Sequence, residues 1–521
     1  MSKLYYIETL GCAMNVHDSE RIAGVMDELG YAHTEIVDEV YNADDGLYII
    51  NTCSVRENAA DKLYGHLGIL KTIKESHPGL KVAVGGCQAQ NDKEYMAKRA
   101  PNKSVDIIFG THNIGSIPKL LEAKKVALEK AKLAEKASEK ASEKLSENSS
   151  DNNSSSSEIK SKRALKRLIN TANKPQIEII GELRDFPSYL PVSYDSPYSA
   201  LVSISVGCNE TCTYCIVPSV RGVEIDRPIA EVLDEIEGLV KSGVKEVTLL
   251  GQNVNAYGFK LSSNGEPVAP GVSPEDAFAT LLSECGQFKD YTSKTGERGA
   301  NGENLSLERV RFTSPHPAGF TPNVIKAMRD TPNIMPSLHM PLQSGSDSVL
   351  KAMKRSYRSR IFLEKIEMIR SVIPNIAITT DIIVGFPGET EEDFQATLDV
   401  LKKVQFTFAY TFQYSIRPGT IAGDMVDQIP HDIVQRRFDE LLKLQNEITY
   451  KGQLDQIDKI HKVLVDKQGG KKDSANQRLK GRSEDGRLIH INNPDGIIKP
   501  GDIVEVKIVH AAPFHLIGDP V

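Results

Sequence analysis

Short apolar segments that alternate with amphipathic helical segments are the feature that most constrains the fold of this chain. Four apolar runs fall within residues 1–118, namely KLYYIETL, DGLYIIN, LKVAVGG and VDIIFG. After the first run, Ile22, Val25 and Met26 recur at helical spacing. Strands that alternate with helices in this way form parallel sheets. We therefore predict an α/β fold that begins with a Rossmann-like parallel-sheet domain.

A second alternating stretch covers residues 191–435. Its apolar runs are YSALVSISVG, VKEVTLLG, LERVRFT, PSLHMP, IAITTDIIVG and FTFAYTFQYS. The intervening segment RPIAEVLDEIEGLVKSG is an amphipathic helix, with Pro228 suited to its first turn and Gly243 to its end. This number of β/α units indicates an open (β/α)6 barrel rather than a closed barrel of eight.

Three of the seven cysteines, Cys12, Cys53 and Cys87, each follow a predicted strand of the first domain. The carboxyl ends of parallel strands lie at one edge of a sheet, which is where open α/β sheets build their sites. These thiols could therefore converge as a ligand set. The alternative is that they are three small buried apolar residues.

A tighter group of cysteines, Cys208, Cys212 and Cys215, has the spacing C-x3-C-x2-C after the first barrel strand. A structural zinc site needs a fourth donor, and ferredoxin-type clusters use four cysteines. The neighbouring residues supply no good fourth ligand. Three thiolates would leave one iron of a four-iron cluster open, at the face where such barrels hold their active sites. We interpret the remaining Cys285 as a structural residue.

Three other regions have a different composition. Residues 119–190 contain the repeat EKASEKASEK and a serine and asparagine tract, which indicate a low-complexity insertion and linker. Residues 259–306 have the composition of a surface insertion in the barrel. Residues 446–521 contain short strands between glycine-rich turns and predict a small antiparallel β-barrel. Its basic residues, which are candidates for RNA binding, are Lys471, Lys472, Arg478, Lys480 and Arg482.

The overall composition excludes some classes of protein. The formal net charge is −7, so contact with a nucleic acid would require a local basic patch. No window approaches the roughly 18 apolar residues of a membrane span. The N-terminal residues lack the apolar core of a signal peptide. We expect a cytoplasmic protein with no membrane partner.

Longer motifs resemble those of the radical S-adenosylmethionine (SAM) methylthiotransferase family, and especially the members that act on N6-dimethylallyladenosine in tRNA. The stretches that carry this resemblance are ETLGCAMNVHDSE, NTCSVRENAADKLYGHLG, GGCQAQ, GCNETCTYCIVPSVRG, LLGQNVNAYG, VRFTSPHP, PLQSGSD, DIIVGFPGETEEDF and YSIRPGT. The C-terminal barrel is similar to a TRAM domain, the RNA-binding module of this family. One departure is Val206, where the family usually has arginine.

The resemblance implies two [4Fe-4S] clusters, one held by Cys12, Cys53 and Cys87 and one held by the C-x3-C-x2-C loop. It implies SAM as cofactor, with one molecule as methyl donor and a second as radical source. The SAM-binding residues that it implies are Tyr214, Gly251, Gln252, Asn253, Gln343, Ser344 and Gly385. No catalytic side chain is implied beyond the cluster ligands.

The implied activity is methylthiolation of carbon 2 of N6-dimethylallyladenosine at position 37 of tRNA. The implied partners are the anticodon stem-loop of that tRNA and an electron donor such as flavodoxin or ferredoxin, and we expect a monomer. Two alternatives are a sister enzyme that acts on threonylcarbamoyl-adenosine in tRNA and one that acts on a ribosomal-protein aspartate. An alternative of another class is a non-enzymatic iron–sulfur protein that binds RNA.

Overall fold

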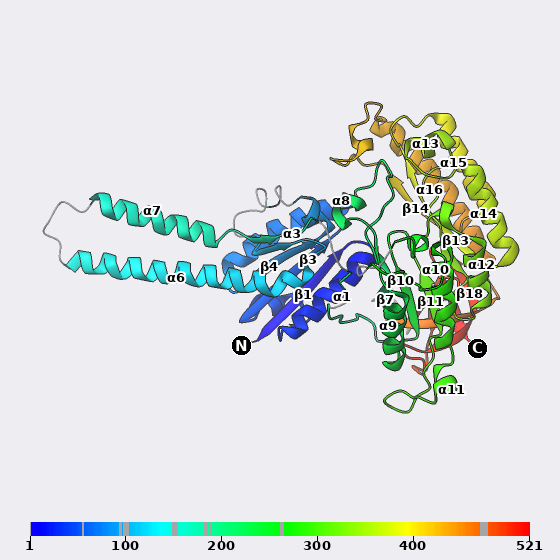
Figure 1. The fold of residues 1–521 in the computed structure, drawn as a ribbon, viewed down its shortest axis with the longest axis horizontal. Helices are drawn as coiled ribbons and strands as arrows, with labels where there is room; N and C mark the ends of the chain where they lie inside the picture. The colour runs from blue at the N-terminus through cyan, green and yellow to red at the C-terminus, as the bar shows by residue number, and fades with distance from the viewer. Residues whose placement is uncertain are drawn as a thin grey trace. The chain divides into compact units, whose positions relative to one another are not determined.

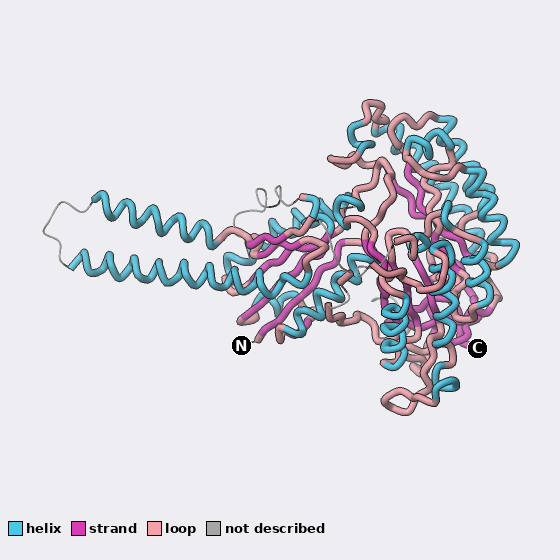
Figure 2. The backbone as a smooth tube through the Cα atoms, in the orientation of Figure 1, coloured by secondary structure: helices cyan, strands magenta, loops and turns pink. Residues whose placement is uncertain are grey.

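The computed structural model divides into two compact units. It describes residues 2–54, 57–92, 96, 104–147, 155–181, 186–187, 190–260, 265–468 and 478–521. The first unit consists of Met1–Leu183, Pro187–Ser193 and Ser219–Gly222, and the second of Arg184–Phe186, Tyr194–Pro218 and Val223–Val521. The helices and strands of each unit are drawn in Figures 1 and 2. None of the helices in the described ranges is both long and apolar enough to cross a membrane.

The first unit is built on a six-stranded sheet in which every neighbouring pair runs parallel. In sheet order the strands are β2 (Ala32–His33), β1 (Lys3–Leu10), β3 (Asp45–Thr52), β4 (Lys81–Gly86), β5 (Ile107–Phe109) and β6 (Gln176–Glu178). Every residue of β3 after its first is buried, because a central parallel strand is covered on both faces. The predicted parallel sheet is confirmed.

Helices cover both faces of this sheet (Figure 1). Their bounds are α1 (Ala13–Glu28), α2 (Val37–Asn42), α3 (Glu57–Ser76), α4 (Cys87–Asn91), α6 (Ile117–Glu147) and α7 (Ser155–Ala172). Ile22 and Ile117, from α1 and α6, belong to one apolar core. Leu63 and Leu67, from α3, belong to a second core that includes the other side chains of β3. The helical spacing in the sequence therefore marks the sides of the helices that pack on the sheet.

The region expected to be an insertion and linker contains regular structure. Helices α6 and α7 lie side by side (Figure 1), and β6 then adds a strand to the edge of the sheet. The buried Lys124 Nζ donates hydrogen bonds to the carbonyl oxygens of Ala172 (2.9 Å) and Lys174 (3.0 Å). This lysine links the N-terminal part of α6 to the C-terminal end of α7 by hydrogen bonds. The repeat EKASEKASEK consists largely of alanine, glutamate and lysine, which have high helix propensity.

The core of the second unit consists of two three-stranded parallel sheets. Their orders are β11-β10-β7 and β12-β13-β14, and a bridge between Val310 and Ile334 lies between them. The strands are β7 (Ser199–Ser203), β10 (Glu246–Leu250), β11 (Arg309–Phe312), β12 (Ser337–His339), β13 (Ala377–Val384) and β14 (Phe408–Gln413). The covering helices are α9 (Ile229–Lys241), α10 (Ala277–Glu284), α12 (Pro322–Asp330), α14 (Ser359–Val372), α15 (Glu391–Val404) and α16 (His431–Leu454). The six strands match the predicted open (β/α)6 barrel.

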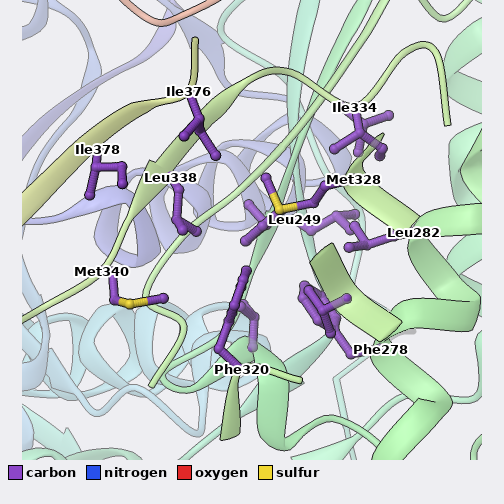
Figure 3. Packing of buried hydrophobic residues seen from close by; sticks show 14 of the residues in the cluster. Leu249, Phe278, Leu282, Phe320, Met328, Ile334, Leu338, Met340, Ile376 and Ile378 are labelled. Atoms are coloured by element: carbon purple, nitrogen blue, oxygen red, sulfur yellow. The ribbon is translucent and has the colours of Figure 1, made fainter. Parts of the chain in front are cut away.

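The segment 259–306, which we expected to be a surface insertion, contributes to the barrel core. Phe278 and Leu282 of α10 are buried in the same apolar cluster as Leu249 of β10 and Phe320, as Figure 3 shows. Cys285 follows α10 and is fully buried there. The glycine, serine and charge of the surrounding loops predicted a surface position for this segment, but its apolar helix α10 packs in the barrel core.

The C-terminal residues form a closed five-stranded barrel in the order β15-β16-β17-β19-β18. Its strands are β15 (Ile460–Gln468), β16 (Arg478–Ser483), β17 (Leu488–Asn492), β18 (Ile503–Ala512) and β19 (His515–Pro520). Four pairings are antiparallel, as predicted, but β17 and β19 pair in parallel. Helix α16 extends past residue 446, so the first barrel strand begins later than the boundary we expected.

Candidate active site

The C-x3-C-x2-C loop lies between the short strand β8 (Ser205–Val206) and α8 (Val217–Arg221). Backbone hydrogen bonds hold the loop in place. Thr213 N donates to Met353 O at 3.1 Å, and Thr213 O accepts from Ala422 N at 2.9 Å. A tight turn joins Cys215 N to Cys212 O at 3.1 Å. The loop is thus supported by segments that lie far away in the sequence.

All three cysteines of this loop line one cavity of about 190 Å³. The other lining residues come from several strands of the barrel. Gln252 follows β10, His316 follows β11, Gln343 follows β12 and Asp381 lies on β13. The cavity therefore lies at the carboxyl ends of the strands, where barrels of this kind place their reacting groups.

The electrostatics of the cavity suit a cationic metal cluster. Burial raises the pKa of the Cys208 thiol to about 12, and burial also raises the pKa of Cys215. Arg355 Nη1 donates to Cys212 Sγ at 3.3 Å and is the cation beside that thiol. Because iron binds thiolates and not thiols, a bound cluster would supply the positive charge that keeps these sulfurs deprotonated.

Two polar side-chain atoms in the cavity wall lack a hydrogen-bond partner among the described residues. They are Asn253 Oδ1 and His316 Nε2, on side chains that are 8% and 7% exposed. A buried polar atom without a partner is costly and calls for a ligand or water to satisfy it. The donor set of three cysteines and these two atoms fit a cluster together with a polar organic cofactor.

The structure places the expected SAM-binding residues in two groups. Tyr214, Gln252, Asn253 and Gln343 line the cavity with the cysteines. The others lie in its supporting wall and do not line it; they are Gly251, Ser344 and Gly385. A Cβ on Gly251 would lie 2.6 Å from Ser205 Oγ. Ser344 Oγ forms a hydrogen bond with Thr397 Oγ1 at 3.3 Å. Gly385 N donates a hydrogen bond to Glu389 Oε2 at 2.8 Å.

The cavity residues that sequence reasoning did not assign to the site include His316, Arg355 and Asp381. His316 stands in the motif VRFTSPHP, directly after the third barrel strand, so its position at a strand end was available as a signal. Arg355 comes from a loop after α13 (Asp347–Ala352), and no spacing in the sequence connects it with Cys212.

In the first unit, Cys12, Cys53 and Cys87 lie just beyond three adjacent parallel strands. Leu10 is in register with Thr52, and Thr52 is in register with Gly86, so the three strands end level with one another. Cys12 comes two residues after the end of β1, and the other two cysteines directly follow β3 and β4. The sheet therefore brings the three cysteines to one edge, and we call them the sheet-edge cysteines.

The contacts among the sheet-edge cysteines are close. A hydrogen bond from Cys53, together with the charge of Arg221, lowers the pKa of Cys12 to about 5. Burial raises the pKa of Cys87, and a hydrogen bond and the charge of Arg221 oppose that rise. Asn15 supports the edge, since its Oδ1 accepts from Cys12 N at 3.3 Å. The charge of the buried Arg221 acts on Cys12 and Cys87, which suits an iron–sulfur centre whose thiolate ligands carry negative charge.

Among the described residues, no three His, Cys, Asp or Glu side chains are grouped tightly enough to hold a single metal ion. A four-iron cluster does not require its ligands to meet at one metal ion, because each cysteine binds a different iron of the cluster. The two cysteine sets therefore suit a multinuclear centre better than a mononuclear one.

The basic residues of the C-terminal barrel share one face of a strand. Arg478, Lys480 and Arg482 alternate along β16 with the buried Leu479 and Gly481, so the three basic side chains point away from the barrel core. Lys471 and Lys472 lie outside the described residues.

The fold and the cysteine loop define a radical SAM enzyme. The family model described as "Radical SAM superfamily" matches residues 202–401, and the one described as "Uncharacterized protein family UPF0004" matches residues 4–110. Among solved structures, the radical SAM methyltransferase TsrM from Kitasatospora setae aligns with 81% of this chain and 77% of its own, at 14% identity and a TM-score of 0.49.

Curated relatives match almost the whole chain. The tRNA-2-methylthio-N(6)-dimethylallyladenosine synthase of Mycobacteroides abscessus is 47% identical over 520 residues, which cover 99% of this chain and 88% of the relative. The enzyme of the same name from Nocardia farcinica is 49% identical over 521 residues, which cover 99% and 89%. This chain belongs to the tRNA-2-methylthio-N(6)-dimethylallyladenosine synthase family.

Proposed function

We propose that this chain, a radical SAM tRNA methylthiotransferase by family, adds a methylthio group to carbon 2 of N6-dimethylallyladenosine at position 37 of tRNA. The reaction uses one SAM as methyl donor and a second as radical source. The single observation that carries this proposal is the pair of three-cysteine sets, one on the sheet edge and one in the barrel cavity. Each set leaves one iron of a four-iron cluster available to a small molecule.

In the barrel cavity, Cys208, Cys212 and Cys215 would hold the cluster that works with SAM. Together these groups supply hydrogen abstraction from a carbon that has no acidic proton, a step that no side-chain base can perform. The protein contributes position and the exclusion of water. Arg355 neutralises one thiolate, and the polar atoms of Asn253 and His316 face the space that SAM would fill.

On the sheet edge, Cys12, Cys53 and Cys87 would hold the second cluster, whose open position would carry the sulfur to be transferred. Arg221 is buried among these residues and provides positive charge. A small reductant protein such as flavodoxin or ferredoxin would supply the electrons.

The anticodon stem-loop of tRNA would contact the outer face of β16. Lys480 and Arg482 lie on this face, and Arg482 is exposed. Phosphate contacts of this kind position a nucleic acid without reading its sequence. The substrate base itself would be recognised in the barrel cavity.

Nucleoside analysis of tRNA tests this function. We expect total tRNA from a deletion strain to lack the 2-methylthio form and to accumulate N6-dimethylallyladenosine, with both changes reversed by the wild-type gene. A gene with Cys12, Cys53 and Cys87 replaced by alanine should fail to reverse them. The controls are a gene with Cys285→Ala and mass analysis of ribosomal proteins from the same strain.

Three outcomes would overturn the proposal. Loss of a 2-methylthio group from threonylcarbamoyl-adenosine instead would assign the sister tRNA activity. Loss of methylthiolation from a ribosomal-protein aspartate would assign the activity on that protein. Unchanged nucleosides and proteins, with RNA binding retained, would support a non-enzymatic RNA-binding protein.

A further inference from the structure

His316 places a hydrogen-bond donor without a partner inside the barrel cavity. Its side chain is 7% exposed and lines the cavity, and Nε2 has no partner among the described residues. The other ring nitrogen, Nδ1, accepts a hydrogen bond from Ala318 N at 3.3 Å. A nitrogen that accepts carries no proton, so the proton of the neutral ring lies on Nε2.

The ring stays neutral at physiological pH. Burial lowers the pKa of His316 to about 3, and the nearby positive charge of Arg355 adds to that effect. His316 is therefore a neutral N–H donor throughout the pH range in which the enzyme would work.

Several contacts fix the direction of this donor. The side-chain amide of Asn255 forms two hydrogen bonds with the backbone of His316. Asn255 Oδ1 accepts from His316 N at 2.6 Å, and Asn255 Nδ2 donates to His316 O at 2.9 Å. The edge-to-face contact with the Tyr357 ring, at 5.4 Å between centroids, holds the imidazole. Ser314 nearby has a φ of +59°, an unfavourable backbone conformation that the surrounding contacts maintain. Such rigidity is typical of a group that meets a ligand in one fixed orientation.

The polar groups around the donor include both hydrogen-bond donors and acceptors. Arg355 lines the same cavity and is close enough to His316 to lower its pKa. The acidic lining residues are Glu210 and Asp381, and Asp381 Oδ2 is 3.3 Å from His339 Nε2. Asn253 Oδ1, also without a partner, is an acceptor in the same cavity. One donor and one acceptor together match the two ends of an α-amino acid group, a carboxylate and an ammonium.

We infer that His316 is a positioning residue whose Nε2–H donates a hydrogen bond to the carboxylate of SAM. A carboxylate has two oxygens and about four acceptor sites, so one oxygen remains available to His316 when the other binds metal. This inference rests on the SAM chemistry of the family and stands whichever base or side chain is methylthiolated. Its test therefore needs no tRNA.

The test compares two substitutions at this position. His316→Phe keeps the ring that packs on Tyr357 and removes the donor, whereas His316→Gln carries an N–H near the place of Nε2. We expect His316→Phe to weaken SAM binding to the anaerobically reconstituted enzyme by roughly tenfold or more, and His316→Gln to restore most of it. Equilibrium dialysis without reductant measures the dissociation constant.

A second probe isolates the carboxylate. Decarboxylated SAM lacks the proposed acceptor, so wild type and His316→Phe should bind it with the same affinity. An equal loss for both probes would mean that His316 supports the cavity without contacting the carboxylate and would overturn the inference. Unchanged SAM binding by His316→Phe would also overturn it.

Further controls separate this contact from general effects. His431→Phe changes an exposed histidine at the start of α16 and should leave SAM binding unchanged. If His316→Phe does not fold, His316→Asn provides the comparison, because its shorter amide replaces Nδ1 and not Nε2; it should lose affinity where His316→Gln does not.

In wild type, the ¹⁵N resonance of His316 should show the Nε2–H form and should shift when SAM binds. A resonance that SAM leaves unmoved would contradict the contact.

Discussion

Arg221 and Asp18, which lie 203 positions apart in the sequence, form a buried ion pair beside the sheet-edge cysteines. Nη2 of the arginine lies 2.5 Å from Oδ2 of the aspartate, and each side chain is about 5% exposed. The aspartate is on α1, the helix that follows Cys12. Arg221 places a positive charge next to Cys12 and Cys87, thiols that must lose their protons before they can bind iron, and Asp18 opposes its effect on the pKa of Cys87.

Removal of this cation should weaken the first unit. Replacing Arg221 with methionine leaves Asp18 buried and without its cation, a change that costs about 3–5 kcal/mol in comparable buried pairs. We expect Arg221→Met to lower the unfolding temperature of the apoprotein clearly. The double variant Asp18→Asn, Arg221→Met should recover much of that loss, since it removes both charges. Equal unfolding temperatures for wild type and the single variant would contradict the structural role of the pair.

Iron content should follow the two cysteine sets. Wild type reconstituted without oxygen should hold about eight irons, and replacement of Cys208, Cys212 and Cys215 by alanine should reduce this to about four. The corresponding replacement of the sheet-edge cysteines should also leave about four. Cys285→Ala is the matched control, because Cys285 is buried in the apolar core of the barrel and does not line the cysteine cavity, and it should retain about eight. A wild-type content near four would rule out a second cubane.

Gly385 should tolerate no side chain, for two physical reasons that a control can separate. Its φ is +76°, and an added Cβ would lie 2.5 Å from Val434 Cγ2. Gly243 has a φ of +95°, and a Cβ added there would have no other atom within 4 Å. We expect Gly243→Ala to cost about 1–2 kcal/mol through the backbone alone and Gly385→Ala to cost about 1–3 kcal/mol more through the clash. Chemical denaturation measures both, and equal losses would show that the helix α16 yields to the added methyl.

Stability should fall as pH rises because of a buried carboxyl near the cysteine loop. Burial, with a contribution from Asp226, raises the pKa of Glu224 from 4.5 to about 8. The folded state then binds this proton more tightly than the unfolded state, so the contribution of Glu224 to the free energy of unfolding is most favourable below pH 4.5 and becomes less favourable as pH rises toward 8.

Glu224→Gln should make that decline smaller, since the amide does not ionise. The unfolding temperatures of variant and wild type, measured from pH 5 to pH 8.5, should differ most at the alkaline end. A smaller decline should remain near pH 6, because burial raises the pKa of Asp226 to about 6. Glu75→Gln, at an exposed position of α3, should follow the wild-type curve. Parallel curves for wild type and Glu224→Gln would refute the shifted pKa.

The outer face of β16 should contribute a salt-dependent part of tRNA binding. Each phosphate contact that is lost lowers the slope of log K against log salt concentration by about one. We expect Lys480→Ala to reduce the slope by about one and to weaken binding of different tRNAs to a similar extent. Lys402→Ala, on the exposed face of α15, is the control and should leave the slope unchanged. An unchanged slope for Lys480→Ala would remove this face from the interface.

Local sequence patterns predicted the main elements of this fold because apolar periodicity reflects which side of an element is buried. The runs that became β1, β3 and β4 are mainly apolar, and β3 and β4 are buried after their first residue, which is typical of central parallel strands. The convergence of the sheet-edge cysteines followed from the same pattern, since each cysteine comes just after a strand of one parallel sheet. The C-x3-C-x2-C spacing, together with its place after the first barrel strand, indicated a cluster with one open iron.

Other features could not be predicted from local patterns. The polar loops on either side of α10 led us to expect a surface insertion although the helix itself is apolar, and the repeat of α6 did not reveal that Lys124 bonds to the end of α7. The parallel pairing of β17 with β19 depends on closure of the barrel. These outcomes depend on contacts between segments that are distant in sequence.

The amino-acid sequence by itself determined the strands, the helices and the two sets of cysteines, because backbone periodicity and ligand spacing are properties of neighbouring residues. Only the tertiary structure decided which charged and polar groups surround those sulfurs. Arg221 reaches Asp18, Arg355 reaches Cys212, and His316 directs a free N–H into the cavity, each through chain segments that folding brings together. The physical reason is that desolvation and electrostatic complementarity act through space and are independent of separation along the chain.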